Sequence, residues 1–176
     1  MKKAIVFFGL VLLSISCVTN ASDNIVTFVC TGNTGRSPMA EALSKEIIKT
    51  KKLNILVASR GVNVDPKELT PEKGTMTVLK ERRIDISEHK ATQLTETDIQ
   101  KSSLLLTMTE KHKEKILLQY PQAKNKVFTL SEYATGKNED LVDPYGKPLD
   151  AYKKVESQLD KLLPIALEKA SSKENK

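Results

Sequence analysis

Short apolar runs alternate with amphipathic stretches along the chain from about residue 25 onward. A short apolar run between polar or turn residues is typical of a buried strand, and apolar residues that recur every three or four positions indicate a helix. Strands are therefore predicted at residues 25–29, 53–58, 104–108 and 126–130. Helices are predicted at residues 38–51, 71–83, 95–101, 111–119 and 149–163, with Pro164 kinking or ending the last one.

The alternation of strands with helices predicts the fold class. Parallel strands joined by crossover helices form a sheet that is covered on both faces. We therefore expect an α/β protein with a four-stranded parallel sheet and helices on both faces. Ligands of such sheets bind beyond the carboxyl ends of the strands, and Cys30 follows the first predicted strand.

The first 21 residues differ from the rest of the chain. Two lysines form a basic start, residues 4–13 are an apolar run, and residues 19–21 offer small side chains for cleavage. This pattern is typical of a secretory signal peptide, and the apolar run is too short for an ordinary membrane span. We expect cleavage after Ala21 and an exported protein, periplasmic or secreted, with an uncleaved anchor as a weaker alternative. Cleavage before Cys17 would instead leave that cysteine to carry a lipid, and only then is a membrane expected as a partner.

Length and charge limit what the mature protein can be. The chain has room for one domain with a proper core, expected at residues 22–170, and the charged residues 171–176 are expected to fray. Loss of the leader lowers the net charge from +6 to +4, and the remaining basic residues are scattered. No basic stretch is interleaved with aromatic residues, and no Cys/His set has metal-ligand spacing. We therefore expect no nucleic-acid partner, no metal and no cofactor.

Cysteine usage points to chemistry. Cleavage after Ala21 leaves Cys30 as the single thiol of the chain. Exported proteins usually hold their cysteines in disulfide pairs. A lone thiol in an oxidising compartment therefore indicates nucleophilic catalysis, although a cysteine that ends a buried strand can also be a small core residue.

Cys30 opens the run Cys-Thr-Gly-Asn-Thr-Gly-Arg-Ser-Pro, which lies between a predicted strand and a predicted helix. The five residues between Cys30 and Arg36 suffice to wrap a loop around one tetrahedral oxyanion. The backbone N–H groups of residues 31–36 and the positive end of the helix would bind that anion, and Arg36 can grip two phosphate oxygens. The same positive field favours the thiolate form of Cys30, which is the nucleophile. Ser37 is expected to cap the helix and Pro38 to occupy its first turn.

The predicted phosphate-binding loop comprises Thr31, Gly32, Asn33, Thr34, Gly35, Arg36 and Ser37. Together with Cys30 it predicts a cysteine-dependent phosphatase. Because expulsion of an unprotonated leaving group is costly, such an enzyme also needs an acid. Residues 139–146 form an irregular loop on the strand-end side, and Asp143 within it is the predicted acid. A loop aspartate can also be no more than a solvated residue or a turn cap.

These motifs resemble those of the low-molecular-weight protein-tyrosine phosphatase family. The resemblance rests on residues 29–33, 36–38, 40–41, 59–61, 89–91 and 143–145, and it extends over about residues 25–163. It implies a flavodoxin-like three-layer sandwich and a phosphocysteine intermediate. Carried onto the matching positions, it implies Cys30 as the nucleophile, Arg36 as the phosphate ligand, and Asp143 as the general acid and then the base. The residues that it implies as braces of the phosphate loop are Asn33, Ser37, Ser59 and His89.

Two positions depart from the family pattern. Many members carry a second cysteine where Gly35 stands, and alanine is common where Arg60 stands. We expect Gly35 to suit an exported enzyme, because a neighbouring thiol in an oxidising compartment could form a disulfide with Cys30. The role of Arg60 stays open.

The sequence leaves two candidate substrates, phosphotyrosine and phosphoarginine. Thr34 stands where tyrosine-directed members tend to carry a larger aliphatic residue, and threonine there resembles the protein-arginine phosphatases. Residues 89–91, by contrast, resemble the tyrosine-directed branch, and Tyr145 could stack on a phenol ring or on a guanidinium plane. A phosphorylated protein or peptide is the expected partner, with phosphotyrosine favoured by a small margin and phosphoarginine as the alternative substrate of the same mechanism. A phosphate-binding module without catalysis is a weaker alternative.

Overall fold

The computed structural model describes residues 24–172. The strands are β1 (Ile25–Cys30), β2 (Leu56–Gly61), β3 (Leu104–Thr107) and β4 (Val127–Thr129). The helices are α1 (Arg36–Lys51), α2 (Lys73–Glu81), α3 (Glu96–Lys101), α4 (Glu110–Gln119), α5 (Leu130–Thr135) and α6 (Leu149–Ser172), with a short 3-10 helix η1 (Pro121–Ala123). The predicted leader, with Cys17 in it, and residues 173–176 of the predicted tail lie outside the described residues.

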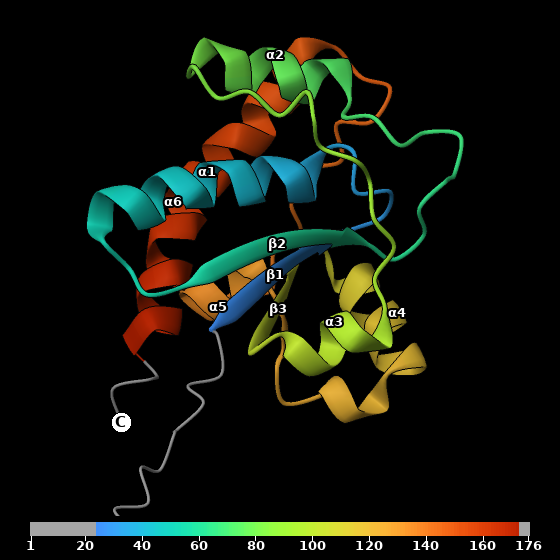
Figure 1. Cartoon of the computed structure of the whole chain (residues 1–176), viewed down its shortest axis with the longest axis vertical. Coiled ribbons are helices and arrows are strands. Elements are labelled where there is room, and N and C mark those ends of the chain that lie inside the picture. Colours follow the sequence, from blue (N-terminus) through green and yellow to red (C-terminus); the bar gives the residue numbers. More distant parts are fainter. Residues whose placement is uncertain (1–23, 173–176) are drawn as a thin grey trace, which may run out of the picture.

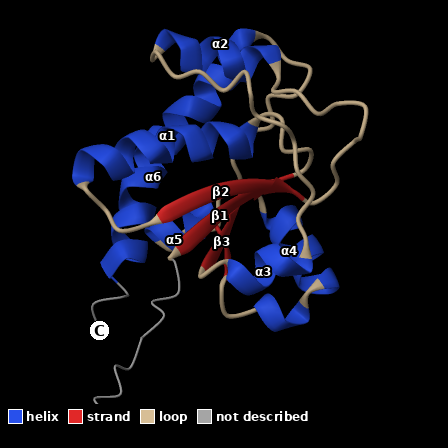
Figure 2. Ribbon diagram, in the orientation of Figure 1, coloured by secondary structure: helices blue, strands red, loops and turns tan. Residues whose placement is uncertain are grey.

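The four strands form one parallel sheet in the order β2-β1-β3-β4, which confirms the predicted flavodoxin-like architecture. The chain passes from β1 to β2 on one side and returns to β3 on the other, so the direction of winding reverses between β1 and β3. Open parallel sheets bind ligands at such a reversal. Cys30, the last residue of β1, lies there, and the long loops gather beyond the same end of the strands (Figure 2).

Helices cover both faces of this sheet (Figure 1). Helices α1, α2, α5 and α6 pack on one side, and α3 and α4 pack on the other. Side chains along β1 point alternately to the two faces of the sheet. Val26 and Phe28 pack in the core on the α1 and α6 side, whereas Val29 packs in the core on the α3 and α4 side. The carboxyl end of β1 is thus held between two apolar cores, and Cys30 extends from a rigid strand.

Helix α6 departs from the prediction at its end. It continues through Pro164 to Ser172, so the helix does not end at the proline and extends past residue 170. The residues after Pro164 keep a buried apolar face, which includes Ala166, Leu167 and Ala170. Packing of this face outweighs the one backbone hydrogen bond that proline removes. None of the described helices combines the length and the apolar character needed to cross a bilayer.

Strand β2 lies three residues later in the chain than predicted. Its register explains the shift, because Leu56 pairs with Ile25 and Gly61 pairs with Cys30 along the full length of β1. The strand therefore includes the polar pair Ser59 and Arg60, which apolar content alone does not mark as strand.

Helix α5 was not predicted. Its six residues are too few to show helical periodicity, and Thr129 and Glu132 start it through a capping box directly after β4. The predicted fourth strand ended at Leu130, but this residue is the first of α5.

Candidate active site

Cys30 lies where β1 ends and the phosphate loop begins. Its side chain is 3% exposed, and it is the free cysteine of the described residues. Its Sγ atom lies 3.0 Å from the Oγ atom of Ser37. This contact joins the thiol of Cys30 to the Ser37 hydroxyl, which also lies within hydrogen-bond distance of the loop residue Asn33.

The position of Ser37 corrects one prediction. Helix α1 begins at Arg36, and Gly35 occupies the N-cap position without a side-chain cap. The prediction that Ser37 caps the helix is therefore wrong. Because the helix starts before it, the Ser37 hydroxyl is available to contact Cys30 and Asn33 of the loop.

The backbone of the loop is arranged for an anion. The Cys30 carbonyl oxygen accepts from Val62 N–H (3.0 Å), and carbonyl oxygens of the loop accept from neighbouring segments: Thr31 from Asn63 N–H (2.9 Å), Asn33 from His89 Nε2 (2.9 Å) and Thr34 from Glu72 N–H (2.9 Å). Within the described residues, by contrast, the backbone N–H groups of residues 31–36 donate to no protein acceptor. A loop with bonded carbonyls and unpaired N–H groups forms an anion-binding nest, which suits the oxygens of a phosphoryl group.

Arg36 and Asp143 meet at the mouth of this loop. Arg36 is the first residue of α1 and is 7% exposed, whereas Asp143 lies in the loop between α5 and α6 and is 59% exposed. The Nη2 atom of Arg36 lies 3.2 Å from the Oδ1 atom of Asp143. The structure thus brings the three predicted catalytic groups, the thiol, the guanidinium and the carboxylate, to one cavity.

Asn33 holds the loop from its buried side. The residue is fully buried, and its φ of 59° is the left-handed conformation that asparagine tolerates better than most residues. Its Nδ2 atom donates to the hydroxyls of Ser37 (2.9 Å) and Ser59 (3.0 Å), and its Oδ1 atom accepts from the N–H of Thr92 (2.9 Å). With His89 bonded to its carbonyl, Asn33 is the point where all the predicted bracing residues meet.

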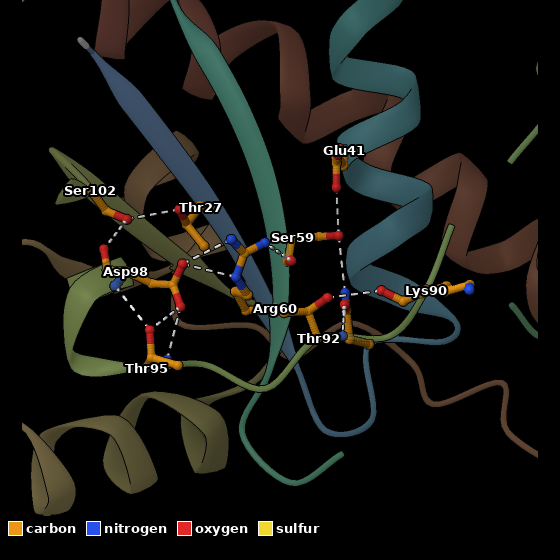
Figure 3. Close-up of polar contacts among 10 residues, drawn as sticks. Thr27, Glu41, Ser59, Arg60, Lys90, Thr92, Thr95, Asp98 and Ser102 are labelled. Carbon is orange, nitrogen blue, oxygen red and sulfur yellow. Dashed lines mark hydrogen bonds and ion pairs between the residues drawn. The ribbon is translucent and has the colours of Figure 1, made fainter. Parts of the chain in front are cut away.

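Two neighbouring residues of β2 extend this bracing in opposite directions (Figure 3). Ser59 donates to Oε2 of Glu41 on α1 at 2.6 Å. Arg60 points to the other side, where its Nε and Nη2 atoms lie 2.9 and 2.8 Å from Oδ1 of Asp98. The Arg60 carbonyl also accepts from the Ser37 hydroxyl at 3.3 Å. Arg60, whose role the sequence leaves open, therefore ties the end of β2 to α3.

Asp98 connects α3 to the sheet. It forms a capping box with Thr95 at the start of the helix. Burial raises the pKa of Asp98, but the hydrogen bonds from Thr95 and Arg60 outweigh burial and lower the pKa overall. The Ser102 hydroxyl donates to the Asp98 carbonyl at 2.6 Å and lies 2.8 Å from the Thr27 hydroxyl of β1 (Figure 3). The charged Asp98 is thus tied to the edge strand β2 through Arg60 and to the central strand β1 through Ser102.

His112 supports the loop from α4. Its Nε2 atom lies 2.8 Å from Oγ1 of Thr31, and its Nδ1 atom lies 2.8 Å from Oγ1 of Thr109, which caps α4. Burial, followed by the charge of Arg36, lowers the pKa of His112 to about 4. The imidazole is therefore neutral near pH 7 and positions Thr31, the residue that follows the nucleophile.

Thr34, one of the two predicted specificity residues, is bonded to Glu72. The Thr34 hydroxyl donates to Oε1 of Glu72 at 3.0 Å, and Oε2 of Glu72 accepts from the Tyr152 hydroxyl at 2.5 Å. Glu72 lines the same cavity as Cys30. The Glu72 carboxylate therefore lies at the cavity in which the rest of a phosphorylated side chain would sit.

The cavity around Cys30 has a volume of about 210 Å³ and an acidic mouth. Among the described residues that line it, the acidic ones are Asp65, Glu68, Glu72 and Asp143, and the one cation is Arg36. Tyr145, the other predicted specificity residue, is 59% exposed, and its hydroxyl donates to Glu68 at 3.2 Å. The charge of Glu68 raises the pKa of Tyr145, so the phenol stays protonated. We refer below to Asp65, Glu68 and Glu72 as the acidic mouth.

Sequence reasoning missed several residues that the site uses. They are Glu41, Glu72, Thr92 and His112, the last of which supports Thr31 of the loop. Glu41 and Thr92 lie in or next to the motifs at residues 40–41 and 89–91, which is the signal that could have found them. Glu72 and His112 carry no such signal, because only the folded loops bring them to the phosphate loop.

This arrangement can transfer a phosphoryl group with the chain's own side chains. The loop binds the oxygens, the thiolate can attack phosphorus, and the exposed carboxylate can exchange a proton with the leaving group and with solvent. Within residues 24–172, no three His, Cys, Asp or Glu side chains come together as a metal site.

Comparison with known proteins agrees with this chemistry. A family model described as low molecular weight phosphotyrosine protein phosphatase matches residues 25–176. A protein-arginine-phosphatase of Bacillus subtilis is 43% identical over 139 residues, which cover 78% of this chain and 91% of that protein. The low molecular weight protein-tyrosine-phosphatase PtpB of Staphylococcus haemolyticus is 37% identical over 135 residues, which cover 76% of this chain and 91% of that protein. A crystal structure of a YwlE mutant from Bacillus subtilis superposes with a TM-score of 0.79 at 40% identity, covering 82% of this chain and 97% of that one. The chain therefore belongs to the low molecular weight phosphotyrosine protein phosphatase family and is a phosphatase.

Proposed function

We propose that the protein is an exported protein-arginine phosphatase, which hydrolyses phosphoarginine in proteins or peptides through a phosphocysteine intermediate. The observation that carries this proposal is the bond between Thr34 and Glu72 at the cavity of Cys30. The sequence alone favours phosphotyrosine by a small margin. The acidic mouth reverses that preference.

Charge separates the two candidate substrates. A phosphoarginine side chain carries a guanidinium cation directly beside its phosphoryl group, whereas the ring of phosphotyrosine is neutral. The acidic mouth attracts the guanidinium and repels a phosphoryl group that has no neighbouring cation. Because Arg36 and the loop amides bind the phosphoryl oxygens of both substrates, the mouth decides between them.

The relatives support the same order of candidates. The Bacillus subtilis relative at 43% identity is named a protein-arginine-phosphatase. The PtpB relative at 37% identity is named a protein-tyrosine-phosphatase, which makes phosphotyrosine the second candidate for the same site.

The proposed reaction has two steps. The Cys30 thiolate forms a bond to phosphorus while the bond from phosphorus to the guanidinium nitrogen breaks, and the leaving nitrogen takes a proton from Asp143. A water molecule then attacks phosphorus and gives its proton to the Asp143 carboxylate. Phosphate leaves, and Cys30 regains its thiolate. Arg36 and the loop amides stabilise the charge on the phosphoryl oxygens in both steps.

A direct test compares two peptides of one sequence, one with phosphoarginine and the other with phosphotyrosine. We expect a kcat/KM at least about 10-fold higher for phosphoarginine, since a neutral ring leaves the acidic mouth without a partner. Thr34→Ile should shift the ratio toward phosphotyrosine by a similar factor, because it removes the hydroxyl. A parent enzyme that is faster on phosphotyrosine contradicts the proposal and assigns the second candidate.

Export is proposed from the sequence of residues 1–21. Cell fractionation with N-terminal analysis of the full-length chain checks it. A mature protein outside the cytoplasm that starts at Ser22 supports cleavage after Ala21, and a lipid-modified Cys17 supports the anchored form. An unprocessed protein in the cytoplasm contradicts export.

A further inference from the structure

Glu72 and Thr34 are joined at two points. Glu72 lies at the N-cap position of α2 and is half-buried. Its N–H donates to the Thr34 carbonyl at 2.9 Å, and its Oε1 atom accepts from the Thr34 hydroxyl at 3.0 Å. The backbone contact holds the two residues at a fixed separation, so the side-chain contact is held with it.

The direction of the side-chain hydrogen bond follows from chemistry. An ionised carboxylate can only accept hydrogen bonds, and a hydroxyl has one proton to donate. Oε2 of Glu72 is occupied by the Tyr152 hydroxyl. Burial and the hydrogen bond to Glu72 raise the pKa of Tyr152, so the phenol keeps its proton and donates. Each carboxylate oxygen therefore accepts one hydrogen bond, Oε2 from Tyr152 and Oε1 from Thr34.

A hydroxyl whose proton is already engaged offers only lone pairs to a further partner. The substrate group that matches it is one that only donates, and a guanidinium has N–H donors and no acceptor. Donation to a carboxylate also polarises the Thr34 oxygen and makes it a better acceptor. The ring of phosphotyrosine has no N–H and cannot use this acceptor.

We propose that Glu72 is a specificity-positioning residue, which holds the Thr34 hydroxyl so that its oxygen accepts an N–H of the substrate guanidinium. This inference rests on the proposed arginine-phosphatase function and deepens it. In this arrangement Tyr152 and Thr34 both donate to the Glu72 carboxylate. The substrate guanidinium in turn donates to the Thr34 oxygen.

Gly35 fits the same arrangement. A Cβ atom at position 35 would lie 2.5 Å from Oε1 and 3.0 Å from the carboxyl carbon of Glu72. A side chain at position 35 would therefore displace the Glu72 carboxylate from its place beside Thr34. The space that many family members fill with a second cysteine is here taken by the Glu72 carboxylate.

Glu72→Gln tests the inference because it keeps the shape and changes the donor pattern. The amide oxygen continues to accept from Tyr152, so the amide N–H₂ faces Thr34 and donates to its oxygen. The Thr34 proton then turns toward the cavity and opposes the guanidinium donors. We expect kcat/KM for the phosphoarginine peptide to fall about 10- to 100-fold, and that for the phosphotyrosine peptide to change less than about threefold.

Three further variants separate positioning from charge and from folding. Glu68→Gln removes the same charge from the acidic mouth without touching Thr34, and we expect a smaller change in the substrate ratio. Thr34→Val should lower the ratio as Glu72→Gln does, and adding Glu72→Gln to it should lower the ratio further by no more than Glu68→Gln does, because only the charge effect remains. In the Glu72→Gln background, Tyr152→Phe frees the amide to turn its oxygen to Thr34, so part of the phosphoarginine preference should return.

The outcomes distinguish the inference from the proposed function. A parent that turns over only phosphotyrosine overturns both. A parent that prefers phosphoarginine, with a Glu72→Gln variant that loses both substrates equally or neither, overturns only the positioning role. Should Glu72→Gln fail to fold, Thr34→Val decides: an unchanged substrate ratio overturns the inference, and a lowered ratio supports it.

Discussion

Asn33 and Thr34 are neighbours in the phosphate loop, yet their surroundings differ in kind. Asn33 is fully buried and is held by hydroxyl, backbone and ring nitrogen groups. Thr34 is bonded to a carboxylate of the acidic mouth, close to the exposed Asp143 and Tyr145. The comparison teaches that one side of the loop sets its shape, whereas the other side faces the cavity of Cys30. Changes on the first side should act mainly on stability, and changes on the second mainly on rate and substrate choice.

The largest effect is expected on the exposed side, for Asp143→Asn. The amide cannot protonate the leaving group or accept a proton from water, so kcat should fall about 10²- to 10⁴-fold. Steady-state kinetics on the phosphoarginine peptide measures the loss, and thermal unfolding should change little because Asp143 is exposed. Asp140→Asn is the matched control in the same loop. Asp140 accepts from the Glu110 N–H, and its loss should leave kcat near the parental value. Equal rates for the two variants would remove Asp143 as the acid.

On the buried side, Asn33→Ala should lower the free energy of unfolding by about 2–4 kcal/mol. It leaves the Thr92 N–H without its partner, removes the hydrogen bonds that Asn33 donates to Ser37 and Ser59, and puts alanine at a positive φ. Chemical denaturation measures the loss. Asn33→Gly is the control, since it removes the same hydrogen bonds but tolerates the backbone, and it should be about 1 kcal/mol more stable than the alanine variant. A stable Asn33→Ala variant with reduced kcat would contradict the division between the two sides.

A smaller effect, limited to acid, is expected for His112. Its pKa in the folded protein is about 4, below the ordinary 6.5 of an unfolded chain. As pH falls through 6.5 the unfolded chain takes up the proton first, so stability is present above pH 6.5 and is lost between pH 6.5 and 4. The loss approaches about 3 kcal/mol at the lower end. The free energy of unfolding, measured from pH 7 to pH 4, should therefore fall more steeply for the parent than for His112→Gln. Parallel curves would show that the imidazole is not held neutral.

The sequence was most informative where chemistry and chain order coincide. Cys30, Arg36 and the alternation of strands and helices could be identified because a strand, a loop and a helix follow one another without interruption. Asp143 lies far away in the chain and was found from its loop and from the family resemblance. The end of α6 could not be predicted, because the buried face beyond Pro164 depends on packing against distant helices.

The contacts that shape the site were harder to predict. Ser37 looks like a helix cap in sequence, but α1 already begins at Arg36, so Ser37 lies inside the helix. Its hydroxyl contacts the Cys30 thiol instead. Glu72 is an ordinary acidic residue before a helix until the fold places it against Thr34. Arg60 stands out only as a departure from the family, and its partner Asp98 lies 38 residues further along the chain. Such pairs depend on tertiary contacts that local patterns do not encode.

The central claim is that the Cys30 sulfur attacks phosphorus. Rapid acid quench of the enzyme within its first turnover of the phosphoarginine peptide, followed by mass spectrometry of the digested protein, tests it most directly, because any covalent intermediate is trapped on the residue that carries it. We predict one phosphoryl group on the peptide that contains Cys30 and none in the Cys30→Ala variant. A phosphoryl group on another residue, or turnover retained in Cys30→Ala, would contradict the claim.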